Sequence, residues 1–329
     1  MDLHPIRFTD VEGFSIGNAQ DMAAATGCTV ILCEEGAVAG VDVRGGAPGT
    51  RETDLLDPVN AAEKIHAVLL AGGSAFGLDA AAGVMEYLEE RRIGFDVGVT
   101  RVPIVCGAVL FDLMIGDHRI RPDKEMGYRA CVNSSNKEYQ EGNAGAGTGA
   151  TVGKLLGMGR AMKSGLGVAC LQVGDLKVGA LVAVNCLGDV IDPRSGRILA
   201  GLLSEDLTTF SNTEEIMMRD YKGQKNPFES NTTIGVIVTN ARVTKARAGK
   251  LASMAHNGYA RTIRPSHTMF DGDTIFALAR GAVDADLSAV GLLSARVMAE
   301  AVIRAVKSAN SLHGFKSYTD FIKQEQNLR

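Results

Sequence analysis

Apolar residues follow two spacings along this chain, and each spacing predicts a different kind of element. Segment 27–46 (GCTVILCEEGAVAGVDVRGG) reads as two β runs around EEG at 34–36, which predicts a hairpin. Segment 167–192 (GVACLQVGDLKVGALVAVNCLGDVID) predicts a second hairpin with its turn at 174–175. Both segments therefore add antiparallel strands to the expected fold.

Helical spacing appears between further strands. Residues 66–92 read as a buried strand, a glycine turn and an Ala-rich helix that Ser74 is placed to cap. Strand 232–240 (TTIGVIVTN) precedes a helix over 244–263, which its first threonine is placed to cap. A long helix is predicted from about 287 to 308, because its apolar residues lie close to helical spacing.

Strands and helices are mixed along the chain, with several hairpins and few strict βαβ units. This pattern favours an antiparallel or mixed layered α/β (α+β) fold over a doubly wound sheet. No linker separates two independent cores, so we expect a single domain over 1–329. The polar segment 203–230 is weakly periodic and contains Asn226-Pro227, so it is predicted to be a mobile surface segment.

Composition narrows the class of protein. The chain has 329 residues, 46% hydrophobic and 22% charged, with a formal net charge of −4, which is ordinary for a soluble globular protein. It has no basic block, which argues against a nucleic-acid partner. No apolar run reaches the ~18 residues of a membrane span, so no membrane association is expected. The six cysteines form no C-x-x-C pair, so metal and disulfide readings are weak and a cytoplasmic location fits best.

Glycine is the compositional outlier, at 39 of 329 residues. The glycines cluster in blocks such as 44–50 (RGGAPGT), 71–77 (AGGSAFG) and 142–154 (GNAGAGTGATVGK). None of these blocks has the G-x-G-x-x-G or G-x-x-x-x-G-K-[ST] spacing of a nucleotide site. We therefore interpret them as tight turns and close backbone approaches, and we expect no cofactor.

Four features have a structural reading beside a chemical one. Lys154 ends a glycine-rich loop and, taken alone, is read as a solvated lysine. Asn185 lies among valines, so if buried it needs partners, either nearby backbone or an oxyanion. His256 and His267 lack motif partners and are interpreted as surface or packing histidines. The two carboxylates of 271–273 (DGD) share one face of an extended chain and could orient an ammonium group or tune a base, although turn chemistry alone could explain them.

The junction Asn231-Thr232 also has two readings. Asn favours turns and Thr favours strands, so a plain turn-to-strand junction explains it locally. Alternatively the bond is made to be cut, which would leave Thr232 as a new N-terminus and a nucleophile. Local sequence alone favours the first reading.

Five blocks together change that balance. The chain resembles the L-aminopeptidase/D-Ala-esterase-amidase family, which includes β-peptidyl aminopeptidases and nylon-oligomer hydrolases, in 41–56, 71–85, 142–154, 231–241 and 264–281. The resemblance implies a four-layer α-β-β-α sandwich of mixed, largely antiparallel sheets, shared in outline with ornithine acetyltransferases. It also implies a precursor that cuts itself between Asn231 and Thr232.

The implied fragments are 1–231 and 232–329, which would stay together in a homo-oligomer, a tetramer or larger. A threonine hydroxyl is a weak nucleophile and needs a base. The freed α-amino group of Thr232, with an ordinary pKa of about 7.7–8.0, could take the hydroxyl proton. Asn231 does not by itself explain the cut.

The resemblance carries over to other residues one at a time. Asp271 and Asp273 match a polar or acidic pair that orients the nucleophile and its amine. Lys154 matches a lysine near the nucleophile, and Asn185 matches an asparagine that supports the oxyanion. The Asp-Gly-Asp order is that of the nylon-oligomer branch, since the aminopeptidase branch has Ser-x-Glu. Phe111 stands where some members have a tyrosine.

The resemblance implies a cofactor-free N-terminal-threonine amide hydrolase. We expect an aminopeptidase or amidase that acts on short peptides, amides or esters through an acyl-enzyme on Thr232. A close variant hydrolyses oligoamides of ω-amino acids. Two further readings stay open: an acyltransferase of the ornithine-acetyltransferase type, and an uncleaved, non-catalytic relative.

Overall fold

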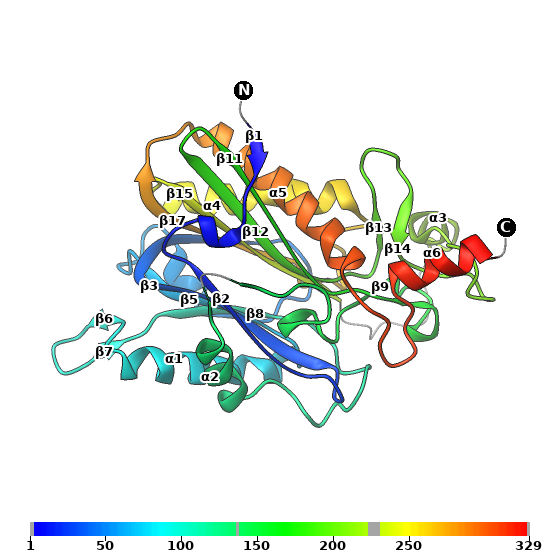
Figure 1. Cartoon of the computed structure of the whole chain (residues 1–329), viewed down its shortest axis with the longest axis horizontal. Coiled ribbons are helices and arrows are strands. Elements are labelled where there is room, and N and C mark those ends of the chain that lie inside the picture. Colours follow the sequence, from blue (N-terminus) through cyan, green and yellow to red (C-terminus); the bar gives the residue numbers. More distant parts are fainter. Residues whose placement is uncertain (1–2, 136–137, 223–230, 328–329) are drawn as a thin grey trace.

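One long strand connects two β-sheets in the computed structural model, which describes residues 3–135, 138–222 and 231–327 (Figure 1). The first half of β3 (Thr26–Val43) pairs with β2 (Ser15–Asp21) and β5 (Ile65–Ala71). Its second half pairs with β17 (Thr274–Val283). Strand β3 thus belongs to both sheets.

The predicted hairpin at 34–36 is therefore wrong. The register of β3 shifts between Leu32 and Ala37, and Gly36 has a φ of 79°. This is a bulge, which bends a strand without reversing it. Each half of β3 finds its partners elsewhere in the chain rather than in the other half.

Sheet A and sheet B are mixed but largely antiparallel. The strand order in sheet A is β1 (Leu3–Pro5), β11 (Leu166–Val173), β12 (Leu176–Asn185), β15 (Thr232–Ala241), β17 and, last, the second half of β3. In sheet B the first half of β3 lies between β2 and β5, and β5 is followed by β8 (Val105–Val109) and β4 (Thr50–Arg51). Only β15–β17 and β5–β8 pair in parallel among the described strands of these sheets. The predicted hairpin at 174–175 is confirmed, since Val173 pairs with Leu176.

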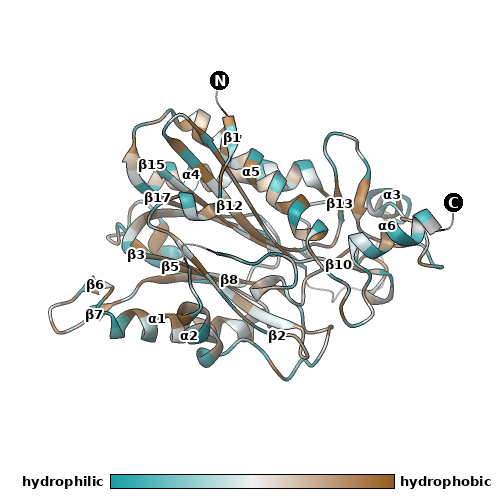
Figure 2. Ribbon diagram, in the orientation of Figure 1, coloured by the Kyte–Doolittle hydropathy of each residue, from teal (hydrophilic) through white to brown (hydrophobic). Residues whose placement is uncertain are grey.

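Helices cover the outer faces of both sheets. Sheet A is covered by α4 (Lys245–Thr262) and α5 (Leu287–Lys307), and sheet B by α1 (Ala80–Glu90) and α2 (Lys124–Val132) (Figure 1). Apolar side chains form one layer between the two sheets and one between each sheet and its helices, and the strands are accordingly hydrophobic in Figure 2. The predicted four-layer α-β-β-α sandwich is confirmed.

Local capping decides where these helices begin. The predicted cap at Thr244 is confirmed, because its side chain accepts a hydrogen bond from the Arg247 amide. The predicted cap at Ser74 is wrong. Ser74 has a φ of 54° and starts a 3-10 turn (Ser74–Asp79) that precedes α1. The glycine block before it therefore serves close packing rather than helix capping: a Cβ at Gly72 would lie 2.0 Å from Asp112 Oδ2.

Smaller elements complete the fold. They are α3 (Thr213–Arg219), α6 (Tyr318–Asn327), β6 (Phe95–Asp96), β7 (Arg101–Val102), β9 (Thr151–Val152), β10 (Met162–Lys163), β13 (Asp189–Ile191), β14 (Ile198–Ala200), β16 (Ile263–Arg264) and the 3-10 turns Phe8–Asp10, Asp54–Leu56, Gly145–Gly147 and Met158–Arg160. Residues 223–230 of the segment predicted to be mobile lie outside the described residues. Within the part of the chain that the structure describes, no helix is long and apolar enough to cross a membrane.

The contact between α4 and β3 gives a test of this packing. A Cβ at Gly40 would lie 2.1 Å from the Gly249 nitrogen, so Gly40→Ala should lower the free energy of unfolding by about 1–3 kcal/mol. A Cβ at Gly249 would meet nothing within 4 Å, so Gly249→Ala should be neutral or stabilise by up to about 1 kcal/mol. Urea unfolding of both variants measures the difference. Equal effects would contradict the close approach of α4 to β3.

Candidate active site

Two separate sequence blocks meet at one end of the central strands of sheet A. Strands β15 and β17 run parallel, so their first residues lie side by side. Just before these strands, Asn231 and Asp271 form a parallel bridge, and the Asn231 amide donates to Phe270 O at 2.8 Å. Thr232 is also the partner of Asn185, at the end of β12. This end of sheet A therefore gathers the first residues of β15 and β17 with the last residue of β12.

Thr232 begins β15 and is buried, with 3% of its surface exposed. Strand alternation places it on the same face as Ile234 and Val236, which belong to the apolar layer between the sheets. Its hydroxyl donates to the carbonyl oxygen of Asn231, and the Gly272 amide donates to the same oxygen at 2.8 Å. The carbonyl of the Asn231-Thr232 bond thus accepts two hydrogen bonds, one of them from the adjacent hydroxyl.

Lys154 and Asn185 form a buried pair beside this bond. Lys154 Nζ donates to the backbone oxygen of Asn185 at 3.0 Å and to its Oδ1 at 2.9 Å. Asn185 Oδ1 also accepts from the Thr151 amide at 3.0 Å, and Nδ2 donates to Phe111 O at 2.9 Å. The reading of Lys154 as a solvated lysine is wrong, because only 2% of it is exposed. Its ammonium group is buried against oxygen acceptors, as a desolvated charge requires.

Little space remains beside this pair in the continuous chain. A cavity of ≈10 Å³ adjoins Lys154, which is about the room that one water molecule needs. Its lining residues are Phe111, Asp112, Met114, Ile115, Thr151, Lys154 and Met158. This cavity is too small for a peptide.

Asp271 is held by backbone and hydroxyl donors. Its Oδ1 accepts from the Leu187 amide at 3.2 Å, and its Oδ2 accepts from the amide and hydroxyl of Thr268. Burial, together with the negative charge of Asp273, raises the pKa of Asp271 to about 6. The carboxyl of Asp271 is therefore poised to exchange a proton near neutral pH.

Asp273 connects the strand after Thr232 to a histidine. Its Oδ1 accepts from the Thr233 amide at 2.8 Å. Its Oδ2 accepts from the His267 amide at 3.0 Å and lies 2.8 Å from His267 Nδ1. The interpretation of His267 as a surface or packing histidine is therefore wrong. His256 is buried, as a packing histidine would be.

The structure brings the predicted side chains together around the Asn231-Thr232 bond: Thr232, Asn185, Lys154, Asp271 and Asp273. The Asp273 carboxylate accepts from the Thr233 amide and the Asp271 carboxylate accepts from Leu187 and Thr268, so their predicted role toward the Thr232 amine stays a prediction. Sequence reasoning missed Gly272 and His267 as parts of the site. Gly272 could be recognised only once the register of β15 and β17 was known. A Cβ there would lie 2.7 Å from Thr232 Oγ1. His267 carries no sequence signal except that it shares a loop with Asp273.

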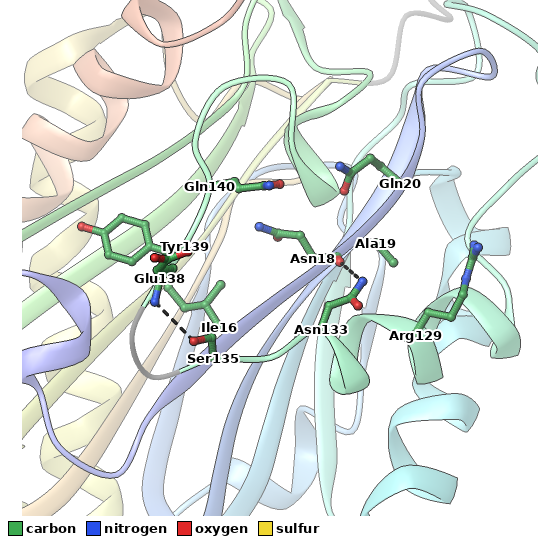
Figure 3. Close-up of a pocket in the computed structure, with 10 residues that line it drawn as sticks. All are labelled: Ile16, Asn18, Ala19, Gln20, Arg129, Asn133, Ser135, Glu138, Tyr139 and Gln140. Atoms are coloured by element: carbon green, nitrogen blue, oxygen red, sulfur yellow. Dashed lines mark hydrogen bonds between the residues drawn. The ribbon is translucent and has the colours of Figure 1, made fainter.

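Other places for a ligand are separate from this cluster. A polar pocket of ≈610 Å³ lies between β2 and α2 and is lined by Asn18, Gln20, Asn133 and Gln140, among others (Figure 3). None of the residues gathered around Asn231-Thr232 lines it. Among the described residues, no group of three or more His, Cys, Asp or Glu side chains could hold a metal ion.

Comparison with known sequences identifies a family. Residues 7–319 match the model of peptidase family S58. An uncharacterized aminopeptidase of Mycobacterium tuberculosis is 42% identical over 343 residues, covering 95% of this chain and 96% of the relative. The 6-aminohexanoate-oligomer endohydrolase of Paenarthrobacter ureafaciens is 33% identical over 328 residues, covering 93% and 89%.

Solved structures show the same fold. A β-aminopeptidase of Burkholderia superposes with a TM-score of 0.71 at 19% identity, covering 98% of this chain and 95% of that one. The L-aminopeptidase D-Ala-esterase/amidase of Ochrobactrum anthropi, described as a variant of the Ntn hydrolase fold, gives 0.70 at 19% identity, covering 97% and 93%. The predicted fold and family resemblance are thereby confirmed.

The raised pKa of Asp271 predicts a pH dependence of stability. Because its pKa is about 6 in the folded chain against an ordinary 3.8, folding favours the protonated carboxyl, and the ionised form costs stability at higher pH. Relative to Asp271→Asn, the wild type should therefore gain about 1–3 kcal/mol in free energy of unfolding between about pH 7.5 and about pH 4. Urea unfolding at both pH values measures this gain. A difference that stays constant or shrinks on acidification would contradict the raised pKa.

Proposed function

The chain belongs to peptidase family S58 and is a hydrolase, and from this premise we propose that it matures by cutting its own Asn231-Thr232 bond and then uses Thr232 as an N-terminal nucleophile. The observation that carries the proposal is the pair of hydrogen bonds on Asn231 O. One comes from the hydroxyl that would attack this carbonyl, and the other from the Gly272 amide.

This arrangement supports a self-cleavage route in three steps. Thr232 Oγ1 attacks the Asn231 carbonyl carbon and loses its proton, and the carbonyl oxygen gains negative charge that the Gly272 N–H stabilises. The C–N bond then breaks, the Thr232 nitrogen takes the proton that the hydroxyl lost, directly or through a water molecule, and an ester joins Asn231 to the Thr232 oxygen. Water hydrolyses the ester, which leaves a carboxylate on Asn231 and a free amine and hydroxyl on Thr232.

Substrate hydrolysis repeats the same chemistry on another carbonyl. The new amine of Thr232 takes the hydroxyl proton as the oxygen attacks, and returns it to the leaving amine. The substrate carbonyl occupies the place that Asn231 O holds in the continuous chain. Asn185 Nδ2 carries two hydrogens and bonds one to Phe111 O, so the second remains for the oxyanion. Lys154 adds a positive charge next to Asn185.

The relatives and the two carboxylates at 271 and 273 support a proposed substrate class. We propose an aminopeptidase or amidase for short peptides, amides or esters, because carboxylates at 271 and 273 suit a free ammonium group. A second candidate is hydrolysis of oligoamides. It is supported by the Asp271-Gly272-Asp273 order and by the 33% identity to a 6-aminohexanoate-oligomer endohydrolase.

Substitution of the nucleophile tests the proposal. The purified wild type should show fragments of about 24 and about 10 kDa, from their residue shares of 34.6 kDa, with Thr232 first in the smaller. Thr232→Ala should stay whole and lose hydrolysis by roughly 10³-fold or more, whereas Thr232→Ser should retain both reactions. Denaturing electrophoresis, intact mass and a hydrolysis assay measure these outcomes.

Thr233→Val is the matched control for this experiment. It removes the neighbouring hydroxyl, which is buried and has no hydrogen-bond partner among the described residues. We expect it to mature and to hydrolyse substrate as the wild type does. A Thr232→Ala protein that still yields the two fragments would refute self-cleavage by Thr232.

Blocked substrates separate the two candidate functions. An aminopeptidase should release the first residue of short peptides and lose activity when the substrate is N-acetylated, because the ammonium group is removed. An oligoamide hydrolase should cut N-acetylated 6-aminohexanoate oligomers at internal bonds. Mass spectrometry of the products from free and N-acetylated peptides, and from free and N-acetylated 6-aminohexanoate oligomers, decides between the two functions.

A further inference from the structure

A cluster of three rings lies behind Asp273, of which His256 and Tyr259 are buried and His267 is partly exposed. His256 and Tyr259 come from α4, and His267 comes from the loop before β17. Ring centroids are 4.8 Å apart for His256 and His267, 5.4 Å for His256 and Tyr259, and 6.2 Å for Tyr259 and His267. His267 is the one of these three rings whose described hydrogen bond reaches a carboxylate of the candidate site.

The hydrogen-bond partners assign protons to the two imidazoles. His256 Nε2 lies 3.0 Å from Asp42 O, and since a carbonyl only accepts, Nε2 carries the hydrogen. Burial lowers the pKa of His256 to about 4, so this ring is neutral near pH 7. His267 Nδ1 faces the Asp273 carboxylate, so Nδ1 is the donor in this pair. The Asp273 oxygen thus accepts from both the backbone and the ring of His267.

We propose that His267 is a positioning residue that fixes the amine of Thr232 by holding Asp273 on the Thr233 amide, an inference that rests on the proposed function. The chain of contacts is short. His267 holds Asp273 Oδ2, and Asp273 Oδ1 accepts from Thr233 N at 2.8 Å. Holding that amide fixes the peptide plane that follows Thr232. The torsion between this plane and the Thr232 nitrogen sets where the freed amine points.

This role distinguishes the two reactions of Thr232. In the continuous chain the Thr232 nitrogen is bonded to Asn231, whose carbonyl is held by Gly272, so its direction is fixed from both sides. After cleavage that second restraint is gone, and the direction of the amine depends on the Thr233 side and on the pairing of Thr232 with Asn185. Loss of the His267 ring should therefore slow substrate hydrolysis, which needs the free amine as base, more than self-cleavage.

Two substitutions at one position test the proposal. His267 has a φ of 59°, a region that glycine and asparagine adopt more readily than other residues. His267→Gly removes the ring donor but keeps the backbone hydrogen bond to Asp273, whereas His267→Asn restores a side-chain N–H. We expect His267→Gly to lower kcat by about 10- to 100-fold, with KM and the rate of self-cleavage changed less than about threefold. We expect His267→Asn to recover most of kcat.

Parallel samples keep the outcomes distinct. Tyr259→Phe removes a hydroxyl with no hydrogen-bond partner among the described residues and should leave kcat at the wild-type value. A His267→Gly protein with wild-type kcat, or one that slows self-cleavage and hydrolysis equally, would overturn the positioning role while the wild type still matures. A wild type that neither matures nor hydrolyses substrate would overturn the proposed function and this inference with it.

Discussion

The parallel pairing of β15 with β17 is the constraint on which the candidate site depends. Its register pairs Ile234 with Thr274. The same register, followed back before the two strands, places Gly272 beside Thr232 and Asp271 beside Asn231. A slip of one residue would turn every side chain to the opposite face and bring a carboxylate against the Thr232 hydroxyl. Each strand buries one face between the sheets and the other under the helices, so a slip would exchange side chains between two closely packed apolar layers, which opposes it. The packing of the sandwich core thus sets the geometry of the candidate site at the ends of these strands.

Local sequence predicted those elements whose signals are themselves local. The turn at 174–175 has its glycine and its two strands in one short segment, and Thr244 caps α4 through its own side chain. The sequence at 34–36 has the same pattern as a hairpin turn, because two β runs around a glycine fit both a turn and a bulge. Its outcome was decided by β2, which immediately precedes β3, and by β5 and β17, which are distant in sequence. Layer order likewise came from the family resemblance rather than from periodicity.

The same division applies to the candidate site. Residue types and their resemblance to a family picked out Thr232 and its polar neighbours, but the environment of each side chain depends on tertiary contacts. Lys154 reads as an exposed lysine until Asn185 is placed against it. His267 reads as a lone histidine until the loop before β17 folds back on Asp273. Neither contact follows from spacing, since the partner is set by how loops cross the end of the sheet.

The glycine-rich block 142–154 shows why this end of sheet A is unlike the rest of the core. Lys163 is fully buried and donates to the carbonyl oxygens of Gly147, Ala150 and Ser164, and burial lowers its pKa to about 7. Asp112, also buried, has its pKa raised to about 6 by the same desolvation. Apolar residues at such positions would stabilise a sandwich at least as well. The backbone that Lys163 holds leads directly to Thr151 and Lys154, which bond to Asn185. These buried titratable groups thus help to place the donors around Thr232 at a cost in stability, a pattern typical of functional sites.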